Sequence, residues 1–88
     1  MATYRIEFAR SAARTFGKLD PQTRRSLEPH ISALAHDPRP EGSKRLVTAD
    51  ELYRIRVGAY RVVYAIEDDV LVVLVVKLGH RRDVYRDR

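Results

Sequence analysis

The chain has 88 residues, of which 44% are hydrophobic and 33% are charged, which excludes a disordered tract and suits one domain spanning residues 1–88. Its 17 Lys and Arg residues against 12 Asp and Glu residues give a net charge of +5, which favours an anionic partner. The chain has no cysteine, which excludes disulfides and thiolate chemistry, so we expect a cytoplasmic protein. The N-terminus has no apolar signal-peptide core, and the longest apolar run is too short for a membrane helix, so we expect no membrane partner.

The first half predicts one strand and two helices. Thr3 to Phe8 alternates apolar and polar residues, which is the period of a half-buried strand. Apolar residues then follow helical spacing from Ala9 to Leu19. Asp20-Pro21 predicts the start of a second helix, and Asp37-Pro38 predicts its end.

Pro29 lies inside this second helical segment. Proline removes one backbone hydrogen bond and clashes with the preceding turn. The sequence therefore predicts a kink there, or two short helices that meet near Glu28. The two predicted helical segments are joined by a short link, so they should form a helical hairpin.

The second half predicts a three-stranded meander, preceded by a short extended piece at Lys44 to Leu46. We expect strands at Leu52 to Val57, Tyr60 to Ile66 and Val70 to Leu78, joined by a type II′ turn at Gly58-Ala59 and a second turn at Asp68-Asp69, with Gly79 ending the last strand. The last strand is apolar on both faces, so it should be central or well covered. The predicted fold class is α+β, with the order β-α-α-β-β-β and a mostly antiparallel sheet packed on an N-terminal helical hairpin.

Arginines occur inside these strands. In a two-residue hairpin, Arg56 faces Arg61, and alternation places Arg54, Arg56, Arg61 and Val63 on one face of the sheet. Directly opposed like charges destabilise a hairpin, so an anion is expected against them, and the planar guanidinium fork suits phosphate. The alternative is a solvated face with acidic neighbours from the loops. Lys44 and Arg45 are further candidates for phosphate binding.

A basic tail follows the last strand. It carries His80, Arg81, Arg82, Tyr85 and Arg86. His80 is suited to proton transfer, Tyr85 to stacking on a base or to covering the core edge, and the arginines to phosphate. The histidines form no metal-ligand pattern with nearby carboxylates, and no nucleotide-binding fingerprint occurs, so we expect neither a metal nor a cofactor.

The sequence resembles the RelE/ParE superfamily of bacterial toxins nearly from end to end. The most specific segments are Y-R-I-R-V-G-A-Y-R-V-V-Y from Tyr53 and G-H-R-R-D-V-Y-R from Gly79. The RelE-like branch cleaves mRNA in the ribosomal A site without a metal, by attack of a ribose 2′-hydroxyl on its own 3′-phosphate. Every member is expected to bind an antitoxin, here a RelB-like protein with an acidic, amphipathic segment.

The resemblance implies roles for individual residues. The basic positions of the second main strand fall on Arg54 and Arg56, which would be electrostatic clamps because arginine is a poor base. Arg61 would stabilise the pentacoordinate phosphate, Tyr85 would orient a base, and either Arg81 or Arg82 would assist the leaving group. His80 is the proton acceptor that the residues offer.

Two other functions remain open from the sequence. A ParE-like toxin would inhibit DNA gyrase without cutting RNA, and a basic binding domain would have no activity of its own. We favour the endoribonuclease because the chain keeps much of the RNA-cleaving set. Its partners would then be mRNA on the ribosome and the antitoxin.

Overall fold

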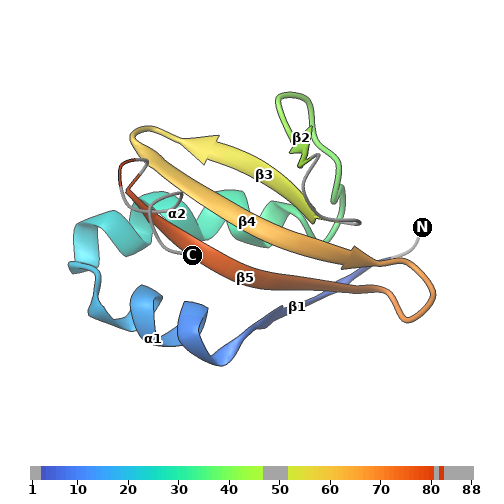
Figure 1. Cartoon of the computed structure of the whole chain (residues 1–88), viewed down its shortest axis with the longest axis horizontal. Coiled ribbons are helices and arrows are strands. Elements are labelled where there is room, and N and C mark those ends of the chain that lie inside the picture. The colour runs from blue at the N-terminus through green and yellow to red at the C-terminus, as the bar shows by residue number, and fades with distance from the viewer. Residues whose placement is uncertain (1–2, 47–51, 81, 83–88) are drawn as a thin grey trace.

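A computed structural model describes residues 3–46, 52–80 and 82. In chain order, its elements are β1 (Arg5–Phe8), α1 (Arg10–Lys18), α2 (Pro21–Ala33), β2 (Lys44–Arg45), β3 (Leu52–Val57), β4 (Tyr60–Glu67) and β5 (Val72–His80). The five strands form one sheet in the order β1-β5-β4-β3-β2, and the two helices pack against it (Figure 1). The predicted α+β class and order of elements are confirmed, including the short extended piece that becomes β2.

The sheet is antiparallel except at one edge. β5 lies between β4, with which it is antiparallel, and β1, with which it is parallel. Its expected central position is therefore confirmed. A parallel neighbour needs a long crossover connection. Here the connection contains the rest of the domain, because β1 and β5 are the first and last strands of the described chain.

The link between the two helices is capped as the sequence predicts. The Asp20 carboxylate accepts a hydrogen bond from the Thr23 backbone N–H at 3.2 Å and another from the Thr23 hydroxyl at 2.6 Å. These bonds lower the pKa of the Asp20 carboxyl below its usual value, and Pro21 occupies the first turn of α2. The Arg24 guanidinium donates to the carbonyl oxygen of Gly17 at 3.1 Å, which ties α2 back to the end of α1. The predicted helical hairpin is thus closed by local polar contacts.

Helix α2 differs from the prediction in two respects. It is one continuous helix through Pro29, so the alternative of two short helices is wrong. Pro29 is exposed, whereas Leu27 and Ile31 beside it are buried and hold the helix on the sheet. The helix also ends at Ala33, before the predicted Asp37-Pro38 boundary. The next residues form tighter bonds three residues back, as in the Leu34 N–H to Ile31 carbonyl bond of 3.0 Å.

The core lies between the helices and one face of the sheet. Its fully or largely buried members are Ala12, Leu27, Ile31, Leu34, Ile55, Val62, Tyr64, Ile66, Val73, Val75 and Leu78. Tyr64 is completely buried, and its hydroxyl donates a 2.8 Å hydrogen bond to the carbonyl oxygen of Pro38. Burial raises the pKa of Tyr64 to about 12. The Tyr53 ring stacks on Tyr64 with a centroid separation of 6.1 Å, which joins β3 and β4 to the loop after α2.

The turn between β4 and β5 is longer than the sequence predicts. The predicted strand Val70 to Leu78 is wrong at both ends, because β5 begins at Val72 and continues through Gly79 to His80. Val70 and Leu71 are in the turn and are 57% and 38% exposed, and Leu71 has a φ of +56°. A β-branched or leucine side chain favours a strand locally, so the reason for this turn must come from tertiary contacts.

Those contacts form a polar cluster at Asp68. The Asp68 carboxylate accepts a 2.5 Å hydrogen bond from the Tyr4 hydroxyl and a 3.0 Å bond from the Arg39 guanidinium. Arg39 also donates to the Tyr53 hydroxyl at 3.1 Å. Arg39 and Tyr4 lower the pKa of the Asp68 carboxyl, while the bond to Asp68 raises the pKa of Tyr4. The cluster joins the start of β1, the loop after α2, β3 and the β4–β5 turn.

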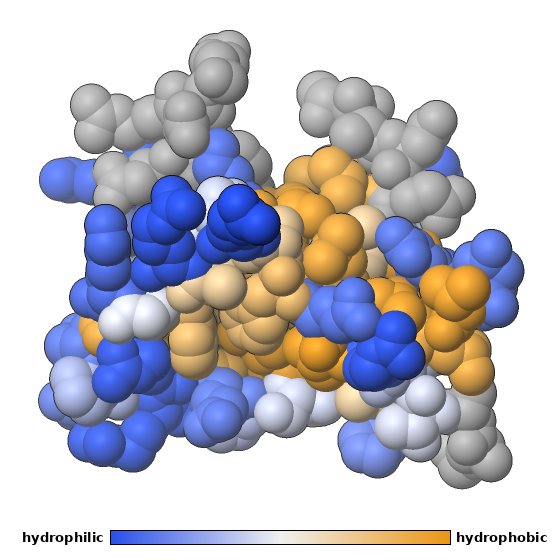
Figure 2. Space-filling view, turned by 90° about the horizontal axis from the view of Figure 1, so that it is seen from below, coloured by the Kyte–Doolittle hydropathy of each residue, from blue (hydrophilic) through white to orange (hydrophobic). Residues whose placement is uncertain are grey.

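The edge strand β1 contributes to an apolar surface. Ile6 and Phe8 are half-buried, and the Phe8 ring contacts Phe16 of α1 at a centroid separation of 5.5 Å. Seen from the side of α1 and β1, apolar side chains gather in the middle of this face and polar side chains surround them (Figure 2). Within the described residues, no helix has the length and apolar content needed to span a membrane.

The Tyr64 hydrogen bond gives a test of the core. We expect Tyr64→Phe to lower the free energy of unfolding by about 1–2 kcal/mol, because the buried Pro38 carbonyl loses its donor. Urea unfolding followed by circular dichroism measures this change. Tyr53→Phe is the matched control, since its hydroxyl bond with Arg39 is exposed and should matter less. Equal losses in the two variants would contradict the importance of the buried bond.

The Asp68 cluster predicts a dependence of stability on pH. A carboxyl pKa that is lowered in the folded state stabilises the fold above the usual value of 3.8, and this contribution is lost as the pH falls below it. At pH 7, Asp68→Asn should therefore be less stable than the original chain. Below pH 3.8 the two proteins should converge in thermal unfolding scans. Asp69→Asn, in the same turn, should show no such convergence, and a constant difference at all pH values would contradict the linkage.

Candidate nucleic-acid interface

The strand register places five basic residues on the face of the sheet opposite the helices. Lys44 pairs with Arg54, Arg54 with Val63, and Val63 with Lys77, so these four positions form one row across β2, β3, β4 and β5. Arg56 pairs with Arg61, and Arg61 pairs with Gly79, which gives a second row. We call Lys44, Arg54, Arg56, Arg61 and Lys77 the cationic face. The predicted alternation of Arg54, Arg56, Arg61 and Val63 is therefore what the structure shows.

A tight turn sets this arrangement on β3 and β4. Gly58 has a φ of +61°, whereas Ala59 is not among the described residues with positive φ. This is the pattern of a type II′ turn, as the sequence predicts. With only two residues in the turn, Val57 pairs with Tyr60 and the two arginines that follow are forced into direct opposition.

The members of the cationic face differ in exposure. Arg54 is only 8% exposed, Arg61 is half-buried with its Nε atom shielded from solvent, and Arg56 is exposed. Val63, between Arg54 and Lys77, is 5% exposed and so gives the face an apolar centre. Charges interact more strongly where water is partly excluded. An anion held near Arg54 and Arg61 would therefore be bound more strongly than one at a fully solvated patch.

The ion pairs observed between described residues lie elsewhere. They are Arg5–Glu7 at 2.7 Å and Arg39–Asp68 at 3.0 Å. Neither pair includes a member of the cationic face. Of the acidic residues in the described loops, Asp68 is engaged with Tyr4 and Arg39.

Lys44 and Arg45, both predicted to bind phosphate, lie on different faces of the sheet. Lys44 belongs to the row of Arg54, whereas Arg45 pairs with Tyr53, whose side chain packs against the core on the helix side. Successive strand residues point to opposite faces. Arg45 is therefore not part of the cationic face.

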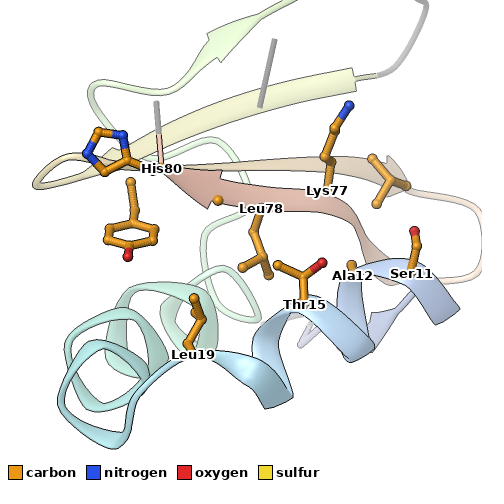
Figure 3. Close-up of a pocket in the computed structure, with 10 residues that line it drawn as sticks. Ser11, Ala12, Thr15, Leu19, Lys77, Leu78 and His80 are labelled. Carbon is orange, nitrogen blue, oxygen red and sulfur yellow. The ribbon is translucent and has the colours of Figure 1, made fainter. Parts of the chain in front are cut away.

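Lys77 is a basic residue that sequence reasoning missed. A bulge in the β4–β5 pairing is responsible, because Val63 pairs with Lys77 while Tyr64 pairs with Val75, leaving Val76 as the extra residue. Counting every second residue from the buried Val73 and Val75 would assign Lys77 to the core. Figure 3 shows that it instead points away from α1, whereas Leu78 points toward it.

His80 lies at the end of β5 and pairs with Tyr60. Its ring is 5.7 Å from the Tyr60 ring in an edge-to-face arrangement, and its Nδ1 atom accepts a 3.2 Å hydrogen bond from the Arg82 backbone N–H. A neutral His80 ring therefore has its lone pair on Nδ1 and its hydrogen on Nε2, which can donate to another group. The imidazole lies level with the strand end and is not directed toward Leu19 (Figure 3).

A pocket of about 340 Å³ opens between α1 and the end of β5. Its lining includes Ser11 and Thr15 of α1, Leu78, Tyr60 and His80 (Figure 3). The pocket opens on the helix side of the sheet, and its lining reaches the cationic face through Lys77. Of the remaining predicted tail residues, Arg82 is exposed, and Arg81, Tyr85 and Arg86 lie outside the described residues.

Comparison with known proteins shows the family of this chain. A family model described as the ParE toxin of the type II toxin–antitoxin system parDE matches residues 6–85. The chain belongs to this toxin family. The expected RelE/ParE membership is thus confirmed, and the protein is the toxin of a toxin–antitoxin system.

Proteins similar to this chain include toxins with the names RelE and RelG. The chain is 26% identical over 87 residues to the putative toxin RelE1 of Methanocaldococcus jannaschii, covering 96% of this chain and 97% of the relative. It is 29% identical over 84 residues to toxin RelG of Mycobacterium tuberculosis, covering 94% and 97%. The toxin in the solved RelBE complex of E. coli superposes with a TM-score of 0.79 at 28% identity, covering 88% of this chain and 95% of that chain.

Opposition of Arg56 and Arg61 predicts a gain in stability when one charge is removed. We expect Arg56→Gln to raise the free energy of unfolding by about 0.2–1 kcal/mol, because directly opposed like charges destabilise a strand pair. The gain should shrink in about 1 M salt, where charges are screened within about 3 Å. Denaturant unfolding at two salt concentrations measures it. Arg25→Gln, an exposed site on α2, is the control, and a loss of stability in Arg56→Gln would contradict this prediction.

Proposed function

We propose that this toxin is a metal-independent, ribosome-dependent mRNA endonuclease. The observation that carries the proposal is the opposition of Arg56 and Arg61 in the second row of the cationic face, with the nearly buried Arg54 beside them. Such an arrangement costs stability in the free protein, and a phosphate backbone would offset that cost. RNA cleavage at a phosphate uses this kind of preorganised positive charge.

The proposed reaction is attack by a ribose 2′-hydroxyl on the adjacent 3′-phosphate. The products are a 2′,3′-cyclic phosphate and a free 5′-hydroxyl. Arg61 would stabilise the charge that develops on the pentacoordinate phosphate, and Arg54 and Arg56 would hold the neighbouring phosphates. His80 would accept the 2′-hydroxyl proton through Nδ1, the nitrogen that accepts a hydrogen bond from the Arg82 N–H in the free toxin and therefore carries a lone pair and no hydrogen.

The C-terminal residues complete this proposal by resemblance. Arg81 or Arg82 would assist the leaving group, Tyr85 would orient a base, and Arg86 would contact phosphate. Lys44 adds a positive charge at the edge of the cationic face. Arg45 points to the other face and is left out of the proposed RNA contacts.

We also propose that a RelB-like antitoxin neutralises this toxin. The E. coli relative was solved as a RelBE toxin–antitoxin complex, and this chain is similar to its toxin over 95% of that chain. The net charge of +5 suits an acidic partner segment. Such a segment would compete with RNA for the cationic face.

A second candidate function is inhibition of DNA gyrase. The family model that matches residues 6–85 is named for ParE, which favours this alternative. The two functions differ in which process they affect, supercoiling of DNA or the integrity of mRNA. A gyrase inhibitor would block supercoiling by purified gyrase and leave mRNA intact in a translating extract.

Arg61→Ala tests the endonuclease. We expect this variant to cut mRNA in a translating extract about 100-fold to 1,000-fold more slowly, because a donor that stabilises transition-state charge is lost. Mapping of mRNA 5′ ends within the first minutes measures cleavage, and thermal unfolding checks the fold. Arg25→Ala changes an exposed residue of α2, and this variant should cut as fast as the original chain. A folded Arg61→Ala protein with full cleavage would refute the proposal.

A further inference from the structure

Lys77 is held on the cationic face by the bulge at Val76. It lies in the same row as Arg54, with Val63 between them, and one row away from Arg61. Diagonal neighbours on adjacent strands are about 7–8 Å apart, which is within the reach of long side chains. Bulges commonly re-aim a side chain next to an active site. Here the bulge brings a lysine beside the arginine that the proposed function places on the phosphate.

A glycine lies between Lys77 and the end of β5. Gly79 follows Lys77 on the same face of β5 and pairs with Arg61, and it has no side chain. Lys77 and Arg61 are therefore both neighbours of Gly79, and His80 follows Gly79 at the strand end. Lys77 itself points away from the helix side (Figure 3).

Lys77 differs from its arginine neighbours in its ability to transfer a proton. A guanidinium does not give up its proton at neutral pH, whereas an ammonium group can donate one and recover it from water. Lys44 is the other lysine of the cationic face, but it is exposed on the two-residue edge strand β2. Lys77 is half-buried on β5, an interior strand of the sheet. Of the two lysines, Lys77 has the position beside Arg61 that a proton donor needs.

We propose that Lys77 donates the proton to the 5′-oxygen that leaves during RNA cleavage, a role that rests on the proposed endonuclease function. The 2′-oxygen forms a bond to phosphorus as the bond from phosphorus to the 5′-oxygen breaks. His80 takes the 2′-hydroxyl proton, and the Lys77 ammonium group gives a proton to the 5′-oxygen. Transfer of these protons to and from water then restores His80 and Lys77.

Three variants test this role in single-turnover cleavage of mRNA on programmed ribosomes. Lys77→Gln and Lys77→Arg should each slow cleavage about 100-fold, a typical loss when a proton donor is removed. Lys77→Arg is decisive, because it keeps the positive charge and loses only the transferable proton. Lys18→Gln makes the same charge change as Lys77→Gln on exposed α1 and should cut at the original rate. Thermal unfolding verifies that each variant is folded.

A second substrate tests whether Lys77 acts in protonation of the leaving group. When sulfur replaces the 5′-oxygen at the cleaved bond, the leaving group is a thiolate, which is stable without a proton. The deficit of both Lys77 variants should then largely disappear, while the deficit of Arg61→Ala should persist. A structural role for Lys77 would slow both substrates equally.

The outcomes separate this inference from the proposed function. Full activity of Lys77→Arg, or an equal deficit on both substrates, would overturn proton donation by Lys77 and leave the endonuclease intact. If the original chain cuts neither substrate on ribosomes, the endonuclease and the role of Lys77 both fail.

Discussion

The positions of the basic side chains depend on the register of β3, β4 and β5, and two backbone irregularities set that register. The positive φ of Gly58 permits a two-residue turn, which forces Arg56 opposite Arg61. The bulge at Val76 then shifts the end of β5 by one residue. A one-residue slip at either place would exchange the faces of every residue beyond it. Charge would then enter the core, so the hydrophobic pattern and the cationic face stabilise the same register.

The sequence was sufficient where local chemistry decides the structure. Asp20-Pro21 starts a helix through its own hydrogen bonds, and Gly58-Ala59 defines a hairpin, from which the facing arginines follow. It was insufficient where distant residues decide. Val70 and Leu71 favour a strand locally, but the bonds of Asp68 to Tyr4 and Arg39 accompany a longer turn. Lys77 was missed because a bulge interrupts the period of two, and the burial of Arg54 could not be read from alternation alone.

The family name does not decide between the two toxin activities. The matching family model is named for ParE, whereas the similar proteins are named RelE1 and RelG, so toxins of both kinds of name match this chain. Arg54 and Arg61 are partly shielded from water, which favours tight contact with a phosphate over a loose electrostatic patch. A proton donor and acceptor beside them would distinguish a cutting site from a binding surface.

The position of β5 between β1 and β4 has a consequence for folding during synthesis. β5 is the last strand of the described chain, yet it lies between β1 and β4 and carries Lys77 and His80. The parallel pairing of Phe8 with Val75 closes a loop that contains most of the domain, and such distant pairings form late in folding. A nascent chain on the ribosome therefore lacks the strand that joins β1 to β4 until β5 has been synthesised. The topology thus delays assembly of the complete cationic face until the strand that completes it is available.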